Sequence, residues 1–308
     1  MGGRAWHGAS VRHRGGWPLP PDTPLPRLNQ LITSLVEHFR DRSLLPSTHK
    51  VRLLRRPNSP SMVQAVRLPC FSLLSIPTAV TPVTVQYLQH ELAHLAEHAL
   101  RRPGAPLAQR WSFDPVRSEG WALLLEYLVR SPAVLRELGI EPATAKTVAR
   151  FLAQEEYFSR GMMAVDAALD TALDGVATPA AALARAVELS APTGLHCASE
   201  ILLLRQIRMV QWRGYLAGYA WRDAVLSVLT TRFGPGWPVS ADAWALLREA
   251  LSSTGSAADF PHTLRTSRTR CGSDPAYVRS SGTAPGGATG PVQAVHGVLR
   301  GQYGLMST

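Results

Sequence analysis

The sequence has few cysteines and no long apolar run. Its three cysteines, Cys70, Cys197 and Cys271, are isolated among 308 residues, which excludes a disulfide framework and a cysteine-based zinc knuckle. No segment approaches the roughly 18 consecutive apolar residues of a membrane-spanning helix, so a membrane partner is not expected. Residues 1–26 lack the apolar core of a signal peptide. We therefore expect a cytoplasmic protein.

Acidic residues are scarce at both ends of the chain, whose net charge is +10. Residues 1–68 hold 11 Lys and Arg against 3 Asp and Glu, and residues 261–308 hold 5 against 1, whereas residues 69–260 are nearly neutral. A basic end can bind nucleic acid or an acidic surface. No basic helix with interleaved aromatic residues and no nucleic-acid motif accompanies it, so we favour a solvated terminus and do not expect a nucleic-acid partner.

The distribution of proline, glycine and apolar residues predicts one helical domain between two disordered ends. Residues 1–26 are rich in proline and arginine, and residues 253–308 in glycine, serine, threonine and proline, so neither end buries enough apolar surface to fold. Residues 27–252 place apolar residues at helical spacing. We expect a mainly α-helical fold, with helices near 28–45, 81–102, 118–130, 132–139, 142–173, 180–189, 200–231 and 241–251.

At most a short β element is expected before the second of these helices. Residues 51–54 and 63–74 contain β-forming residues broken by prolines, which suits one or two short strands or an extended loop. Thr81 and Pro82 suit the N-cap and first turn of the following helix. Ser118 is the expected N-cap of the next one.

The most informative stretch is His90-Glu91-Leu92-Ala93-His94, an H-E-x-x-H pattern. Residues four apart share a helix face, so His90 and His94 can direct two imidazoles at one point. Zinc accepts imidazole and carboxylate ligands in a tetrahedral shell, and a catalytic site leaves one position for water. Glu91 lies beside that position and can take a proton from zinc-activated water. The pattern predicts a zinc site with Glu91 as general base.

A carboxylate further along the chain can complete the ligand set. Glu119 follows His94 after 24 intervening residues and begins an apolar segment. Glu126 lies about two helical turns beyond it on the same face, where it can hold a ligating histidine by the ring nitrogen that does not bind metal. The alternative is that these histidines are ordinary helix residues. His94 and His98 are also four apart, but that pair has no acid in the general-base position.

Two stretches of the chain resemble known zinc peptidases. Glu119-Gly120-Trp121-Ala122-Leu123, with Glu126, resembles the E-G-W-A-L-x-x-E segment of the bacterial DUF885 family of metallopeptidase-like helical proteins. The downstream glutamate also resembles that of the gluzincin peptidases, whose third zinc ligand is a glutamate. Residues 160–170 resemble the family's R-x-x-x-V-D-x-x-L-H helix, and residues 211–218 keep its Q-x-x-x-Y-x-x-G spacing.

The resemblance implies a gluzincin-type zinc metallopeptidase, a hydrolase that cleaves peptide substrates. It implies that His90, His94 and Glu119 hold the zinc ion. Tyr215, in the Q-x-x-x-Y-x-x-G segment, is the candidate for stabilising the oxyanion.

Further residues are candidates for supporting roles around this site. Arg160 and Gln211 lie in the two resembling segments, and Arg213 can receive a substrate carboxylate as a fork, so these three are the candidates for substrate binding. Asp166 and Asp170 are four apart on one predicted helix. They can orient a metal-binding histidine or a basic substrate group, or form a solvated face.

The chain departs from the DUF885 pattern at several positions. Leu124 stands where the family has tyrosine, Asp170 where it has histidine, and Met209-Val210 where it has Pro-Gly. These changes keep the zinc ligands but alter the expected substrate pocket. A non-catalytic binding protein of the same fold is therefore an alternative. A regulator with a nucleic-acid-binding basic N-terminus is another.

Overall fold

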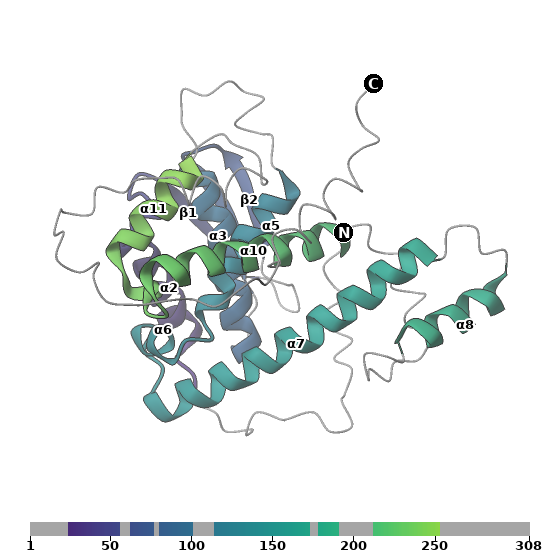
Figure 1. The fold of residues 1–308 in the computed structure, drawn as a ribbon. Helices are drawn as coiled ribbons and strands as arrows, with labels where there is room; N and C mark the ends of the chain where they lie inside the picture. Colours follow the sequence, from purple (N-terminus) through teal and green to yellow (C-terminus); the bar gives the residue numbers. More distant parts are fainter. Residues whose placement is uncertain are drawn as a thin grey trace, which may run out of the picture.

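The computed structural model describes residues 24–55, 62–76, 80–100, 114–172, 178–190 and 212–252. Within these ranges the chain is mainly α-helical, with one small sheet (Figure 1). The helices are α2 (Leu28–Asp41), α3 (Pro82–Leu100), α5 (Pro115–Leu128), α6 (Pro132–Glu137), α7 (Pro142–Ala172), α8 (Pro179–Ser190), α10 (Trp212–Phe233) and α11 (Ala241–Ser252). Apart from residues 24–26, the two predicted disordered ends lie outside the described residues.

The sheet has three strands in the order β1-β3-β2. They are β1 (Lys50–Arg55), β2 (Met62–Arg67) and β3 (Phe71–Ile76), with β1 parallel and β2 antiparallel to β3. Leu74 and Ile76 of the central strand are fully buried, because alternate residues of a strand face opposite sides and one side of this sheet packs on the helices. β2 is an edge strand, and its backbone reaches Glu91 of α3.

α3 lies at the centre of the helical layer, and most of its surface is buried. Leu88, Leu92 and Leu95 are almost wholly shielded from solvent. The indole Nε1 of Trp121 on α5 donates a hydrogen bond to the Ala93 carbonyl oxygen at 2.9 Å, and the whole Trp121 side chain is buried. This contact sets α5 against the middle of α3, beside the two histidines of the H-E-x-x-H pattern.

α10 crosses α5 at two glycines (Figure 1). A Cβ on Gly120 would lie 2.5 Å from Cε3 of Trp221 and 3.1 Å from the Gly218 carbonyl oxygen. A Cβ on Gly218 would lie 3.1 Å from the Gly120 nitrogen and 3.2 Å from Cβ of Glu119. Only residues without a side chain fit this crossing, so the E-G-W-A motif brings α10 against Glu119.

The described helices confirm the predicted mainly α-helical fold, and the differences are local. The structure has three short strands where one or two, or a loop, were expected, because Pro57, Pro60 and Pro69 fall between strands. The first helix ends at Asp41 rather than near residue 45, since Ser43 adopts a left-handed conformation with φ of 52°. Residues 200–211 of the predicted 200–231 helix lie outside the described residues.

The predicted N-cap of α5 was wrong. The helix begins at Pro115, and the Asp114 side chain caps it by accepting hydrogen bonds from the backbone nitrogens of Val116 and Arg117. Aspartate followed by proline is a stronger start signal than serine alone. Ser118 therefore lies inside the first turn, where its hydroxyl is available for another role.

Candidate metal centre

Three side chains from two helices converge on one point. α3 contributes His90 and His94, whose Nε2 atoms lie 3.2 Å apart. α5 contributes Glu119, whose Oε2 lies 3.4 Å from His90 Nε2 and 3.8 Å from His94 Nε2. Within the described ranges, this is the one group of His, Cys, Asp and Glu residues spaced to hold a metal ion.

The chemistry of this group fits a zinc ion. Glu119 Oε2 is buried and makes no hydrogen bond to the described residues, although it faces two imidazole nitrogens. A tetrahedral zinc ion with bonds of about 2.0–2.1 Å separates its ligand atoms by about 3.3–3.4 Å, close to the three distances observed. Two nitrogens and one carboxylate oxygen are also a ligand set that zinc prefers.

The second ring nitrogen of His90 is held by a buried carboxylate. His90 Nδ1 lies 2.9 Å from Glu126 Oε2, and the other oxygen of Glu126 accepts a hydrogen bond from Gln86 Nε2. With Nδ1 donating to Glu126, the ring nitrogen of His90 that faces Glu119 and His94 is Nε2. A carboxylate on the outer nitrogen orients a metal-binding histidine and increases its basicity.

The second ring nitrogen of His94 is held by a serine that sequence reasoning had treated only as a helix cap. His94 Nδ1 lies 3.2 Å from Ser118 Oγ, and Ser118 Oγ donates to Glu97 Oε2 at 2.7 Å. Because the hydroxyl proton goes to Glu97, Ser118 accepts from His94 Nδ1–H. This leaves the lone pair of His94 at Nε2. The nearest sequence signal was the position of Ser118 directly before Glu119.

The two imidazoles of the group differ in how readily they take up a proton. Burial opposes protonation of His90, but Glu119 and Glu126 outweigh it and hold the pKa of His90 well above its usual value. Burial and the neighbouring His90 lower the pKa of His94 to about 4, although Glu119 opposes this. Burial also acts to raise the pKa of Glu119, yet the two imidazoles hold it below its usual range.

Glu91 lies between α3 and the free edge of β2. Its Oε2 accepts a hydrogen bond of 2.6 Å from the backbone nitrogen of Val63. Burial raises the pKa of Glu91 to about 7, while His90 and the Val63 hydrogen bond oppose the shift. A carboxyl group with a pKa near neutrality can both accept and release a proton at physiological pH.

Tyr215 reaches the group from α10, three residues before Gly218. Its hydroxyl hydrogen-bonds to the Glu119 carboxylate. Burial and the nearby carboxylates of Glu119 and Glu91 raise the pKa of Tyr215 well above its usual value, so the phenol keeps its proton. The hydroxyl thus contacts the candidate third ligand.

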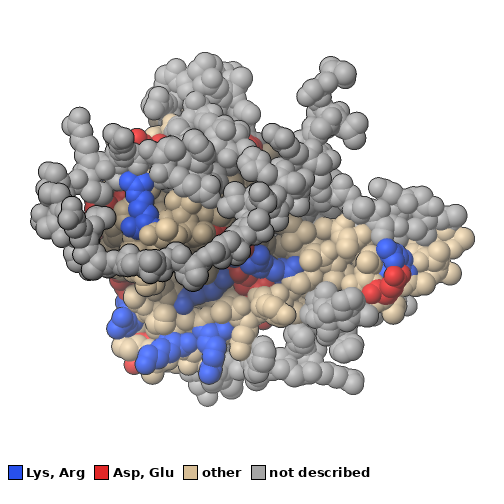
Figure 2. Space-filling view, in the orientation of Figure 1, with Lys and Arg blue, Asp and Glu red and all other residues tan. Residues whose placement is uncertain are grey.

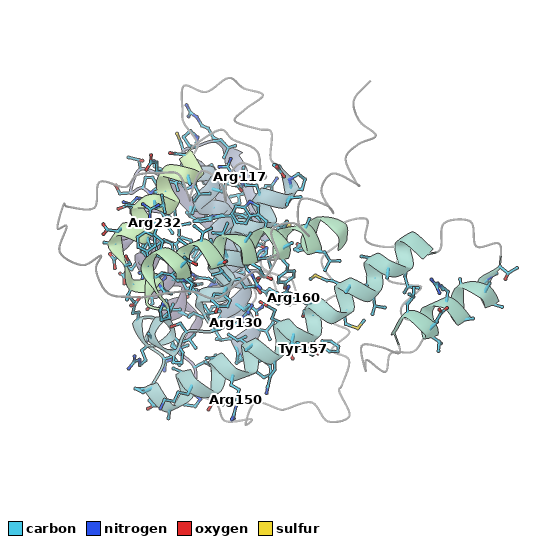
Figure 3. The ribbon with its side chains drawn as sticks, viewed as in Figure 1. Arg117, Arg130, Arg150, Tyr157, Arg160 and Arg232 are labelled. Carbon is cyan, nitrogen blue, oxygen red and sulfur yellow. The ribbon has the colours of Figure 1, made fainter. Side chains whose placement is uncertain are left out.

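Arg160 lies at the exposed end of a charge network between α7, α10 and the end of α5. Its Nη2 lies 2.9 Å from Asp223 Oδ2, and its guanidinium lies over the ring of Tyr219. Glu156 receives both Nη atoms of Arg222, at 2.6 and 2.9 Å, and also contacts Arg130. Figure 3 labels Arg130 and Arg160 between α7 and α10, and Figure 2 shows basic and acidic side chains in the same region.

The remaining sequence-predicted residues are placed less fully. Asp166 is buried on α7. Asp170 lies on α7 and Arg213 on α10, but their side chains lie outside the described part of the structure. Gln211 lies outside the described residues altogether. The structure therefore brings His90, His94, Glu119, Glu126 and Tyr215 together, and places Arg160 in the α7–α10 network.

Comparisons with models of protein families, with curated proteins and with solved structures gave no match for this chain. Among the described residues, no helix has the length and apolar character needed to cross a membrane. The geometry of the site therefore carries the functional argument.

Proposed function

We propose that the protein is a zinc-dependent hydrolase, most simply a peptidase of the gluzincin type. One observation carries the proposal. A buried carboxylate oxygen of Glu119 has no hydrogen-bond partner within the described residues, and it faces the Nε2 atoms of His90 and His94 at 3.4 and 3.8 Å. Burying such an oxygen is costly unless something pairs with it, and a zinc ion held by these three atoms would do so.

When bound, zinc would polarise a carbonyl oxygen and make a water molecule more acidic. The chain's own residues then have separate tasks. Glu91 accepts a proton at its carboxylate and returns it to the leaving amine, a role that its pKa near 7 suits. Glu126 and Ser118 hold the two imidazoles by their Nδ1 atoms. Tyr215 holds Glu119 through its hydroxyl.

Peptides are the proposed substrates because of the resemblance to the DUF885 and gluzincin patterns. The H-E-x-x-H pattern followed by E-G-W-A supports it, and so does the edge strand β2 beside Glu91. Arg160 was a candidate for binding the substrate. Its contacts with Asp223 and Tyr219 favour a structural role instead, so the substrate-binding residues are proposed to lie elsewhere.

Metal analysis of the purified chain tests the ligand assignment. We expect about one zinc ion per chain, and Glu119→Ala should weaken zinc binding by orders of magnitude. Glu249→Ala, which removes an exposed carboxylate on α11, is the matched control and should keep the metal. If Glu119→Ala binds zinc as tightly as the unmodified protein, Glu119 is not a ligand.

A peptide-library digest tests the chemistry separately from the metal. Glu91→Gln keeps the shape of the side chain but cannot accept a proton, so it should retain zinc and lose hydrolysis by at least about 100-fold. Equal hydrolysis by the variant would remove Glu91 from the mechanism.

A zinc-binding protein without turnover is the second candidate. The hydroxyl of Tyr215 interacts with Glu119, and Leu124 stands where the DUF885 pattern has tyrosine. Bound zinc with no cleavage of any peptide in the library would favour this function over hydrolysis.

A further inference from the structure

The outer face of the sheet is the side opposite the buried Ser72, Leu74 and Ile76. Strand pairing arranges its side chains in three rows that run across the strands: Lys50–Phe71–Arg67, Arg52–Leu73–Gln64 and Leu54–Ser75–Met62. Met62 is 51% exposed, and Phe71, Leu73 and Leu54 are partly exposed. The face therefore combines aliphatic surface with cations at its rims.

The charge of this face is positive. The sequence has no acidic residue between Asp41 and Glu91. Lys50, Arg52 and Arg67 are exposed, and none of their side chains forms an ion pair or hydrogen bond with the described residues. Arg55, which faces the other side of the sheet, instead contacts Asn29 of α2. Three exposed cations on one face attract a partner of negative charge.

We propose that this face is a docking surface for an acidic polypeptide segment in which carboxylates alternate with aliphatic residues. The cations on β1 and β2 would pair with the carboxylates of the segment. Leu54, Met62 and Leu73 would contact its aliphatic side chains. A single-stranded nucleic acid fits less well. Such ligands stack successive bases on several aromatic rings, and this face offers one ring, Phe71, which is only partly exposed.

The docking surface borders the candidate metal centre through β2. Gln64 and Arg67 lie on the same strand as Val63, whose backbone nitrogen donates to Glu91. Binding to this face is nevertheless a property separate from hydrolysis, and it can be measured without turnover.

The test uses the full-length chain carrying Glu91→Gln, so that the probe stays intact. The probe is a fluorescein-labelled decapeptide of alternating glutamate and leucine, followed by fluorescence anisotropy at about 50 and 300 mM salt. We expect binding that weakens at the higher salt, because the Debye length shortens. Adding Lys50→Gln, Arg52→Gln and Arg67→Gln together should weaken binding at low salt by at least about 10-fold.

The matched control carries Arg40→Gln, Arg136→Gln and Arg150→Gln, which remove the same charge from exposed helix positions. It should change binding by less than about 3-fold. Equal weakening in both triple variants would show only a general charge effect and overturn the proposal. Absence of peptide binding would also overturn the proposal. So would a 15-nucleotide oligo-dT strand that binds more tightly than the peptide and loses its binding in the Lys50, Arg52 and Arg67 triple variant.

Discussion

Ser118→Ala tests whether the hydrogen-bonded path from His94 to Glu97 supports the metal ligands. The substitution removes one oxygen inside α5 and leaves the helix start, which Asp114 caps, unchanged. His94 Nδ1 then loses its 3.2 Å partner and Glu97 Oε2 loses its 2.7 Å donor. The His94 ring is free to rotate or to place its proton on Nε2, the atom that faces Glu119.

The magnitude follows from these two contacts. Loss of a group that orients a metal-binding histidine typically costs about 10- to 100-fold in metal affinity. The buried Glu97 carboxylate loses a hydrogen bond, which costs about 1–3 kcal/mol of unfolding free energy. Zinc affinity would be measured by competition with a chromogenic chelator, and stability by urea unfolding of the metal-free chain.

Ser75→Ala is the matched control, since the Ser75 hydroxyl is buried but has no hydrogen-bond partner among the described residues. It should leave zinc affinity unchanged. If Ser118→Ala lowers stability but binds zinc as tightly as the unmodified chain, then Ser118 is structural and does not position His94.

Three further predictions concern the helix crossing, an acid-sensitive histidine and the tyrosine of α10. Gly120→Ala should cost about 1–3 kcal/mol of unfolding free energy and weaken zinc binding, because its Cβ would lie 2.5 Å from Trp221; unchanged thermal unfolding would contradict the tight crossing. Burial and Arg42 lower the pKa of His38 to about 3, below its unfolded value near 6.5, so stability should fall by up to about 1.4 kcal/mol per pH unit as pH drops below 6.5; urea unfolding of His38→Gln should show a shallower slope. Tyr215→Phe should weaken zinc binding if the hydroxyl holds Glu119 and should lower turnover about 100-fold if it also serves an oxyanion; unchanged values of both would remove Tyr215 from the site.

The sequence was sufficient to predict most of the helices and the residues that meet at the candidate metal centre. Helical spacing alone places His90 and His94 on one face of α3, and the interval from Glu119 to Glu126 places both carboxylates on one face of α5. Helical spacing does not, however, predict that the α3 histidines and the α5 carboxylates meet in space. It depends on Trp121 docking α5 on α3, which no local pattern specifies.

The residues missed by sequence reasoning are those whose roles depend on contacts between distant segments. Ser118 was predicted only as a helix cap and Glu97 had no predicted role, whereas the packing of α5 on α3 brings their side-chain oxygens within 2.7 Å. For Arg160 the sequence predicted a functional role, and the contacts in the structure favour a structural one. Its place in a segment that resembles the DUF885 pattern suggested a role in substrate binding. Its guanidinium instead pairs with Asp223, from a helix that begins more than 50 residues later.

The glycines of the α5–α10 crossing link the fold to the proposed chemistry. Without side chains at Gly120 and Gly218, the two helix backbones approach closely enough for the Tyr215 hydroxyl to reach Glu119. A wider crossing would leave the Glu119 carboxylate supported only by the imidazoles that it faces. The E-G-W-A motif thus combines three tasks in adjacent positions: the candidate ligand is Glu119, the close approach is at Gly120, and the anchor to the histidine helix is Trp121. A change at any of these positions should be detected first in zinc affinity, because each one alters where the Glu119 oxygen lies relative to the two imidazole nitrogens.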